Sequence, residues 1–234
     1  MPRRKPRKAT RRPRKARVPR GMAMVPVTQK PGYKGHPFGQ KFYTKLRYNE
    51  SHTFSASSTP NFASSYKIRM NGLNDPNFTG VGHQPLGYDE LMTIYEKATV
   101  VAAKITVAYV GDTTVPSVVG VRLADGNEST IADKKKAIEN GDSKWSYMTT
   151  ANGGNNRIIL SKTVNIKKFF NVASIVGNEK FTLAATENPN TDDTCIAEIW
   201  VAPISSADTH GRTLIDYTVE YTAVFTEPKD IALS

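Results

Sequence analysis

The residues of this chain with the clearest chemical purpose are the cations of its first twenty positions. Guanidinium and ammonium groups bind phosphate, and arginine holds it best because its planar fork of donors grips two phosphate oxygens at once. These cations carry the whole formal net charge of +11, because the rest of the chain has 21 basic and 21 acidic residues. The predicted nucleic-acid-binding residues are Arg3, Arg4, Lys5, Arg7, Lys8, Arg11, Arg12, Arg14, Lys15, Arg17 and Arg20, followed by Lys30 and Lys34.

The composition of residues 1–20 also predicts their conformation. Like charges repel, apolar side chains are too few to form a core, and Pro2, Pro6, Pro13 and Pro19 interrupt any helix. We therefore expect a disordered, extended arm, which suits a polyphosphate ligand. A tail that only increases solubility is the alternative, but it explains the excess of arginine and the absence of acids less well.

A short basic cluster lies within this arm. It consists of Arg11, Arg12, Pro13, Arg14 and Lys15, and clusters of this kind act as nuclear localisation signals. Phosphate contact alone would also produce such a cluster. The sequence thus predicts nuclear import through residues 11–15, with the nuclear import machinery as a partner and nucleic-acid contact as the alternative.

The remaining reactive residue types form no catalytic or metal-binding pattern. Spacing for metal ligands is absent, as are a Cys-x-x-Cys pair, a His-Glu-x-x-His pair, a phosphate-binding loop and a nucleophile elbow. We expect no catalytic residue, no metal, no cofactor and no enzymatic activity. The residues considered are His36, His52, His83, His210 and Cys195.

Three of the candidates have specific structural expectations. His83, in a Gly/Pro-rich turn, is predicted to pack locally, and Cys195 to be a small core residue. Asp75 and the pair Asp192–Asp193 could bind calcium at a subunit contact, but a solvated loop is the default expectation.

The elements that position these residues read mainly as strands. Apolar and polar residues alternate, with many aromatic and β-branched side chains, and the last strand alternates so regularly that a slip of one residue would bury two acids. The eight predicted strands are residues 42–54, 66–70, 100–110, 115–123, 157–166, 179–184, 195–204 and 215–225.

Two segments have helical periodicity instead. Residues 88–97 place apolar side chains at helical spacing, and residues 129–140 begin with Thr130 and Asp133 in a capping arrangement. The three lysines at 134–136 are expected on a solvated helix face, with DNA contact as the minor alternative. The predicted fold is an all-β, eight-stranded antiparallel jelly-roll sandwich with long loops, two short helices and a disordered basic N-terminal arm.

We divide the chain into a basic arm and Pro/Gly-rich linker at 1–40, a jelly-roll domain at 41–228 and a C-terminal tail at 229–234. About 200 residues suffice for one such sandwich. Apolar runs long enough for membrane insertion are absent, and the single cysteine suits a reducing compartment.

Residues 45–110 carry a resemblance to a known family. The segments are Lys45–Tyr48, residues 66–76, the run Gly82-His83-Gln84-Pro85-Leu86-Gly87-Tyr88-Asp89, and residues 94–107. Together they resemble the capsid proteins of circular, Rep-encoding single-stranded DNA viruses, the circovirus-like group. Position 86 is a departure, because we would expect a basic residue there, and the arm is shorter than in some members.

This resemblance implies a capsid protein that self-assembles into a small icosahedral shell around a single-stranded DNA genome, with the arm inside. Its expected locations are the virion and the host cell nucleus. A shell of about sixty copies would bring about 660 arm cations to the genome. The slope of log affinity against log salt concentration would be about −8 for each arm. The host receptor is not specified by the sequence.

Two other functions stay open at this point. The arm does not distinguish DNA from RNA, so the coat protein of a small RNA or satellite virus is one alternative. A non-assembling nucleic-acid-binding protein is the other, although it would be expected to have a basic body, whereas residues after 49 carry sixteen basic and 21 acidic residues. Tyr33, Phe38, Phe42 and Tyr43 at the arm's exit either stack on bases or anchor the linker.

Overall fold

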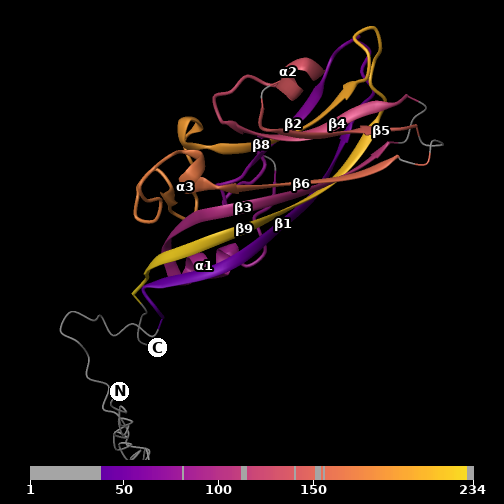
Figure 1. Cartoon of the computed structure of the whole chain (residues 1–234). Helices are drawn as coiled ribbons and strands as arrows, with labels where there is room; N and C mark the ends of the chain where they lie inside the picture. Colours follow the sequence, from indigo (N-terminus) through magenta and orange to yellow (C-terminus); the bar gives the residue numbers. More distant parts are fainter. Residues whose placement is uncertain are drawn as a thin grey trace, which may run out of the picture. The chain divides into compact units, whose positions relative to one another are not determined.

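Two antiparallel sheets packed face to face make up the body of this protein (Figure 1). The computed structural model describes residues 38–80, 82–111, 115–139, 141–150, 154 and 156–230. The first sheet has the order β1-β9-β3-β6, and the second has the order β2-β8-β4-β5. The strands are β1 (Lys41–Phe54), β2 (Ser64–Arg69), β3 (Tyr95–Gly111), β4 (Ser117–Asp125), β5 (Ser143–Met148), β6 (Arg157–Asn165), β7 (Thr182–Leu183), β8 (Cys195–Pro203) and β9 (Thr213–Pro228).

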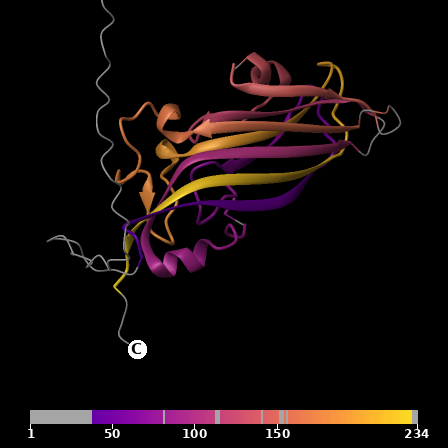
Figure 2. The ribbon, with the colours of Figure 1, turned by 60° about the horizontal axis from the view of Figure 1, so that its bottom comes forward.

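The pairing of these strands is nested. β1 pairs with β9, β2 with β8, β3 with β6, and β4 with β5, while the two-residue β7 only extends β3. A long hairpin whose arms roll up across two sheets has this nested pattern, which is the jelly roll. The predicted fold class is therefore confirmed. Figure 2 shows β1 (indigo), β9 (yellow), β3 and β6 following one another across the first sheet.

The alternation of apolar and polar residues in β9 determines which face of the first sheet is buried. Tyr217, Val219 and Tyr221 are buried between the sheets, whereas Asp216 and Glu220 lie on the outer side. The hydroxyl of Tyr221 donates to the carbonyl of Arg69 at 2.7 Å, so a buried polar group is satisfied across the core. The register of this strand follows its hydrophobic pattern, as predicted.

A second, smaller core covers the outer face of the second sheet. It includes Ile131, Ala137 and Trp200, contributed by the loop after β4, by α2 (Lys134–Glu139) and by β8. α2 lies above β4 in Figure 1. Beneath it, Arg122 and Glu198 form a fully buried ion pair at 2.7 Å. The second core therefore covers the outer face of this sheet at β4 and β8, whereas in the first sheet the outer side of β1 is exposed.

Two strand predictions were wrong. Residues 179–184 supply only Thr182–Leu183, because a single short stretch there meets β3. The eighth strand of the jelly roll is β5, which the sequence reasoning missed. In β5 the aromatic residues Trp145 and Tyr147 point outward and are 38% and 51% exposed, so its pattern does not follow the usual burial of apolar side chains.

The helices are shorter than predicted. α1 (Tyr88–Ile94) ends before the expected residue 97, because Tyr95 and Lys97 pair with β9 and so belong to β3. α2 begins at Lys134, and Asp133 caps it by accepting from the backbone N–H of Lys136 at 2.9 Å. A third helix, α3 (Ile166–Phe169), was not predicted.

Candidate nucleic-acid interface

The outer side of β1 carries four exposed residues in alternate positions. Because successive side chains of a strand point to opposite faces, Lys41, Tyr43, Lys45 and Arg47 share the outer face, while Leu46 and Tyr48 are buried in the core. The sequence pattern indicated this alternation. A strand that exposes three cations and one aromatic ring on a single face is a candidate surface for a polyanion.

Strand pairing brings two more cations to the same face. β9 lies between β1 and β3, and the register places Lys41 and Lys97 on either side of Thr226. In another row of the same face, Arg47 and Lys104 lie on either side of Glu220. Residues more than fifty positions apart in the sequence are thus neighbours on one sheet face. We refer to Lys41, Tyr43, Lys45, Arg47, Lys97 and Lys104, together with Glu220, as the basic face.

The surroundings of Glu220 show that this face is positively charged. Its carboxylate lies 2.7 Å from the Nη2 atom of Arg47, and the Nε atom of Arg47 also donates to it at 2.9 Å. The hydrogen bond and charge of Arg47, followed by the charges of Lys45 and Lys104, hold the pKa of Glu220 below its usual value. One carboxylate is surrounded by three cations, so the face keeps a positive excess that phosphates can neutralise.

The aromatic residues at the start of β1 divide into two roles. Tyr43 is 64% exposed and lies between Lys41 and Lys45 on the basic face. Phe42 points the other way, and its ring stacks on Tyr95 with centroids 6.2 Å apart. Phe38 is 40% exposed, and Tyr33 lies outside the described residues. The stacking hypothesis therefore fits Tyr43, whereas Phe42 anchors the strand to the body.

This arrangement has a definite chemical capacity. Cations in a row along a strand can follow a phosphate backbone, and an exposed ring among them can stack on an unpaired base. Neither contact reads base identity, so binding would be independent of sequence. All of the site residues predicted in residues 1–34, including the cluster at 11–15, lie outside the described residues. Arg47, Lys97 and Lys104 were missed as site residues, because only the strand pairing brings them together.

The other candidate residues have structural surroundings. His83 lies with Nδ1 2.8 Å from the carbonyl oxygen of Gln84 and Nε2 3.1 Å from that of Asn49, and its ring packs on Tyr48. This confirms the predicted packing role. Cys195 is fully buried at the start of β8, and burial raises the pKa of its thiol, as expected for a core residue.

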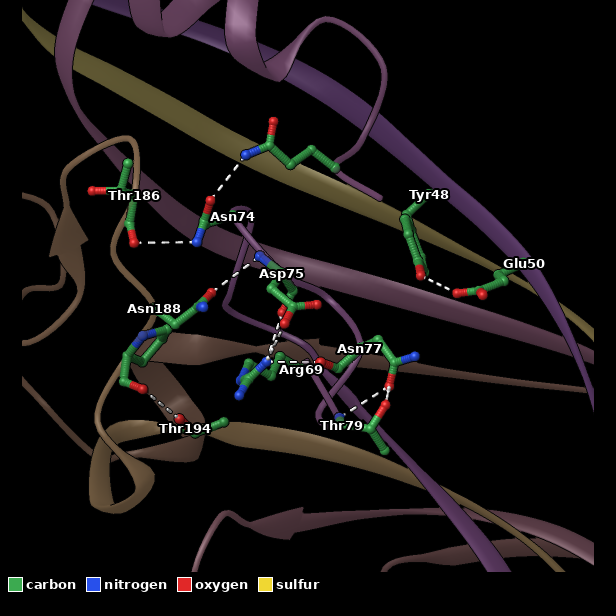
Figure 3. Close-up of polar contacts among 12 residues, drawn as sticks. Tyr48, Glu50, Arg69, Asn74, Asp75, Asn77, Thr79, Thr186, Asn188 and Thr194 are labelled. Carbon is green, nitrogen blue, oxygen red and sulfur yellow. Dashed lines mark hydrogen bonds and ion pairs between the residues drawn. The ribbon is translucent and has the colours of Figure 1, made fainter. Parts of the chain in front are cut away.

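Of the aspartates considered for calcium, Asp75 and Asp193 have cationic partners, and Asp192 accepts from the side-chain amide of Asn127 at 2.6 Å. Arg69 donates to the carbonyls of Asp75 and Asn77, each at 2.8 Å, and its guanidinium lies 3.5 Å from the carboxylate of Asp75 (Figure 3). Asp193 pairs with Lys180 at 3.0 Å. Across the described ranges, His, Cys, Asp and Glu form no group of three that could hold a metal ion. Arg69 instead fastens the turn after β2 to the sheet.

Comparisons with known proteins return structural likeness only. Family models and curated proteins give no match. Among solved structures, the chain is similar to the BFDV capsid protein crystallised as a 60-mer, with 9% identity, 84% of this chain and 100% of that chain covered, and a TM-score of 0.46. It is also similar to tobacco necrosis virus, with 12% identity, coverage of 82% and 85%, and a TM-score of 0.46.

A third structure, from Desmodium yellow mottle tymovirus, has 13% identity, coverage of 88% of this chain and 99% of that chain, and a TM-score of 0.38. The jelly-roll order of the present chain rests on its own strand pairing. In the described part of the chain, the helices are too short to span a lipid bilayer.

Proposed function

We propose that this chain is the structural, non-enzymatic subunit of a small icosahedral virus capsid, which self-assembles and packages single-stranded DNA. The observation that carries the proposal is the position of the basic face on a jelly-roll body. That face lies at the beginning of β1, directly after residues 1–40, which hold 13 of the chain's 32 basic residues. In the sequence, the cations of residues 1–20 are thus followed by Lys30 and Lys34 and then by the cations of β1.

Within this proposal the two parts of the chain have different tasks. The arm, together with Lys30 and Lys34, captures nucleic acid through its phosphates, and the jelly-roll domain at 41–228 builds the container. Residues 41–234 carry 19 basic and 21 acidic residues, so the body is close to neutral while one of its faces is basic. A near-neutral body lets identical copies approach one another, and a basic face gives the packaged strand a surface to follow.

Assembly of the purified full-length chain tests the first half of the proposal. Sedimentation velocity and electron microscopy should show closed particles of about sixty copies, the number expected for the smallest icosahedral shell. A stable monomer at high protein concentration, with nucleic acid present, contradicts the proposal. A chain lacking residues 1–20 is the matched comparison: it should keep its fold and lose its nucleic acid.

The chemistry of the packaged strand tests the second half. Nucleic acid extracted from the particles should be degraded by DNase and resist RNase. The reverse result replaces the DNA virus with a small RNA or satellite virus, because phosphate contacts do not distinguish the two polymers.

Nuclear import through residues 11–15 is a separate part of the proposal. A fluorescent reporter fused to residues 1–20 should enter the nucleus, and the same fusion with Arg11, Arg12, Arg14 and Lys15 changed to alanine is the control. A reporter that stays in the cytoplasm with the intact arm removes the nuclear localisation from the proposal and leaves the capsid role untouched.

A further inference from the structure

The far end of the same sheet face has a different character from the basic face. The end of β3 and the beginnings of β6 and β9 lie together at the right-hand end of the strands in Figure 2. The strand register places four apolar residues next to one another there, on the outer face. Val110, Leu214 and Ile159 are 38%, 37% and 58% exposed, and Ala108 between them is half-buried. We refer to these four residues as the apolar patch.

Two opposite charges flank the apolar patch at diagonal corners. The register pairs Ala108 with Asp216 on β9 and with Ile159 on β6, and pairs Val110 with Leu214 on β9 and with Arg157 on β6. Asp216 and Arg157 are both exposed. Two strand spacings and two residues separate them, about 12 Å between Cα atoms. Among the described residues, neither has an ion-pair partner in its own chain.

We propose that the apolar patch is a two-fold contact with a second copy of this chain, in which Asp216 of each copy pairs with Arg157 of the other. The geometry of the sheet supports this pairing. A two-fold axis in the plane of the face, perpendicular to the line from Asp216 to Arg157 and through its midpoint, exchanges the two charged corners. The apolar residues lie within about 2 Å of that axis in projection, so they meet their own counterparts.

The chemistry of the patch favours a copy of the chain over another partner. An isologous contact requires a self-complementary surface, and one acid and one base at opposite corners of an apolar centre satisfy that requirement. The next row toward the basic face consists of Asn49, Thr218, Thr106 and Ser161, so the apolar character ends there. Asn49 also donates to the carboxylate of Asp216 at 3.0 Å, which orients it.

The size of the patch indicates where this contact operates. A stable dimer in isolation usually buries about 800 Å² on each partner, more than these six residues provide. The contact is therefore one of several in an assembly, and this part of the inference depends on the proposed capsid function. Its loss should shift assembly without unfolding the subunit, because all six residues are at the surface.

Charge reversal tests the inference directly. Asp216→Arg and Arg157→Asp each turn both ion pairs of the contact into like-charge pairs, and each should raise the protein concentration needed for particles at least about tenfold. The double variant, with the two charges exchanged, should return that concentration to the wild-type value. Lys135→Asp, an exposed reversal on α2 outside the other sheet, is the control and should assemble as wild type.

A cysteine close to the axis gives a second measurement. In assembled particles of an otherwise wild-type chain, a short bismaleimide should join Ile159→Cys subunits into covalent dimers. The same reagent should not join Lys135→Cys subunits. The native Cys195 is buried. Single reversals that assemble as wild type, a double variant that stays impaired, or an Ile159→Cys protein without crosslinks overturns the inference. These results leave the capsid function standing, which instead fails if the wild-type chain forms no particles.

Discussion

Removing charge from the basic face should weaken nucleic-acid binding by an amount that its geometry sets. Lys45 and Lys104 are exposed cations whose charges act on Glu220, and each can engage one phosphate. Changing both to glutamine should make the slope of log affinity against log salt shallower by about 1.4, because each contact with a single strand contributes about 0.7. Between about 50 and 200 mM salt, the loss of affinity should then be about sevenfold smaller than in the wild type.

The assay is fluorescence anisotropy of a labelled mixed-sequence DNA strand, with the full-length chain at concentrations below those that form particles. The control removes two lysines elsewhere, Lys135→Gln with Lys167→Gln, which lowers the net charge equally but leaves the basic face intact. An unchanged slope in the Lys45 and Lys104 variant, or an equal change in the control, would refute the reasoning, because binding would then follow total charge and not position.

Three further results follow from the same structure. Glu220→Gln should tighten DNA binding in anisotropy titrations, since it removes the acid of the basic face. Because neighbouring cations hold the pKa of Glu220 low, its carboxylate stays charged at a lower pH than an ordinary one. The gain in affinity over wild type should therefore persist to that lower pH. Gly120→Ala would place a Cβ atom 2.4 Å from the ring of Trp200, so denaturant unfolding should show a loss of about 1–3 kcal/mol. His210 is buried with Nδ1 3.0 Å from a carbonyl oxygen and Nε2 2.9 Å from Ser64, and burial lowers its pKa. On acidification, the unfolded chain therefore takes up a proton at a higher pH than the folded chain does. The free energy of unfolding should fall below about pH 6.5, by at most about 1.4 kcal/mol per pH unit. It should fall less in His210→Gln.

Most of the fold was predictable because alternation is a local property. In β9, the buried residues Tyr217, Val219 and Tyr221 recur with period two, and a shift of one residue would place Asp216 and Glu220 in the core. The predictions were wrong where strand pairing, and not the local sequence pattern, decides the secondary structure. Tyr95 has helical spacing from the residues before it, yet its pairing with the end of β9 places it in β3.

The edge strand β5 is the clearest example of this limit. Its aromatic residues Trp145 and Tyr147 are partly exposed, because β5 is at the edge of its sheet and contributes no residue to the second core. The alternation of β5 was present in the sequence, but its inner side is marked only by Met148. A one-sided hydrophobic signal is too weak to identify a strand when its neighbours in space are unknown.

The amino-acid sequence by itself determined that a polycationic arm precedes a nearly neutral, strand-rich body, because charge and alternation are both written along the chain. Only the tertiary structure decided that Arg47 and Lys104 share Glu220, and that Arg157 and Asp216 lie at opposite corners of an apolar patch. Those groupings depend on β9 lying between β1 and β3 and on β6 lying beside β3. The physical reason is that a sheet face is assembled from every second residue of strands that are distant in the chain, so its character exists only once the strands are paired.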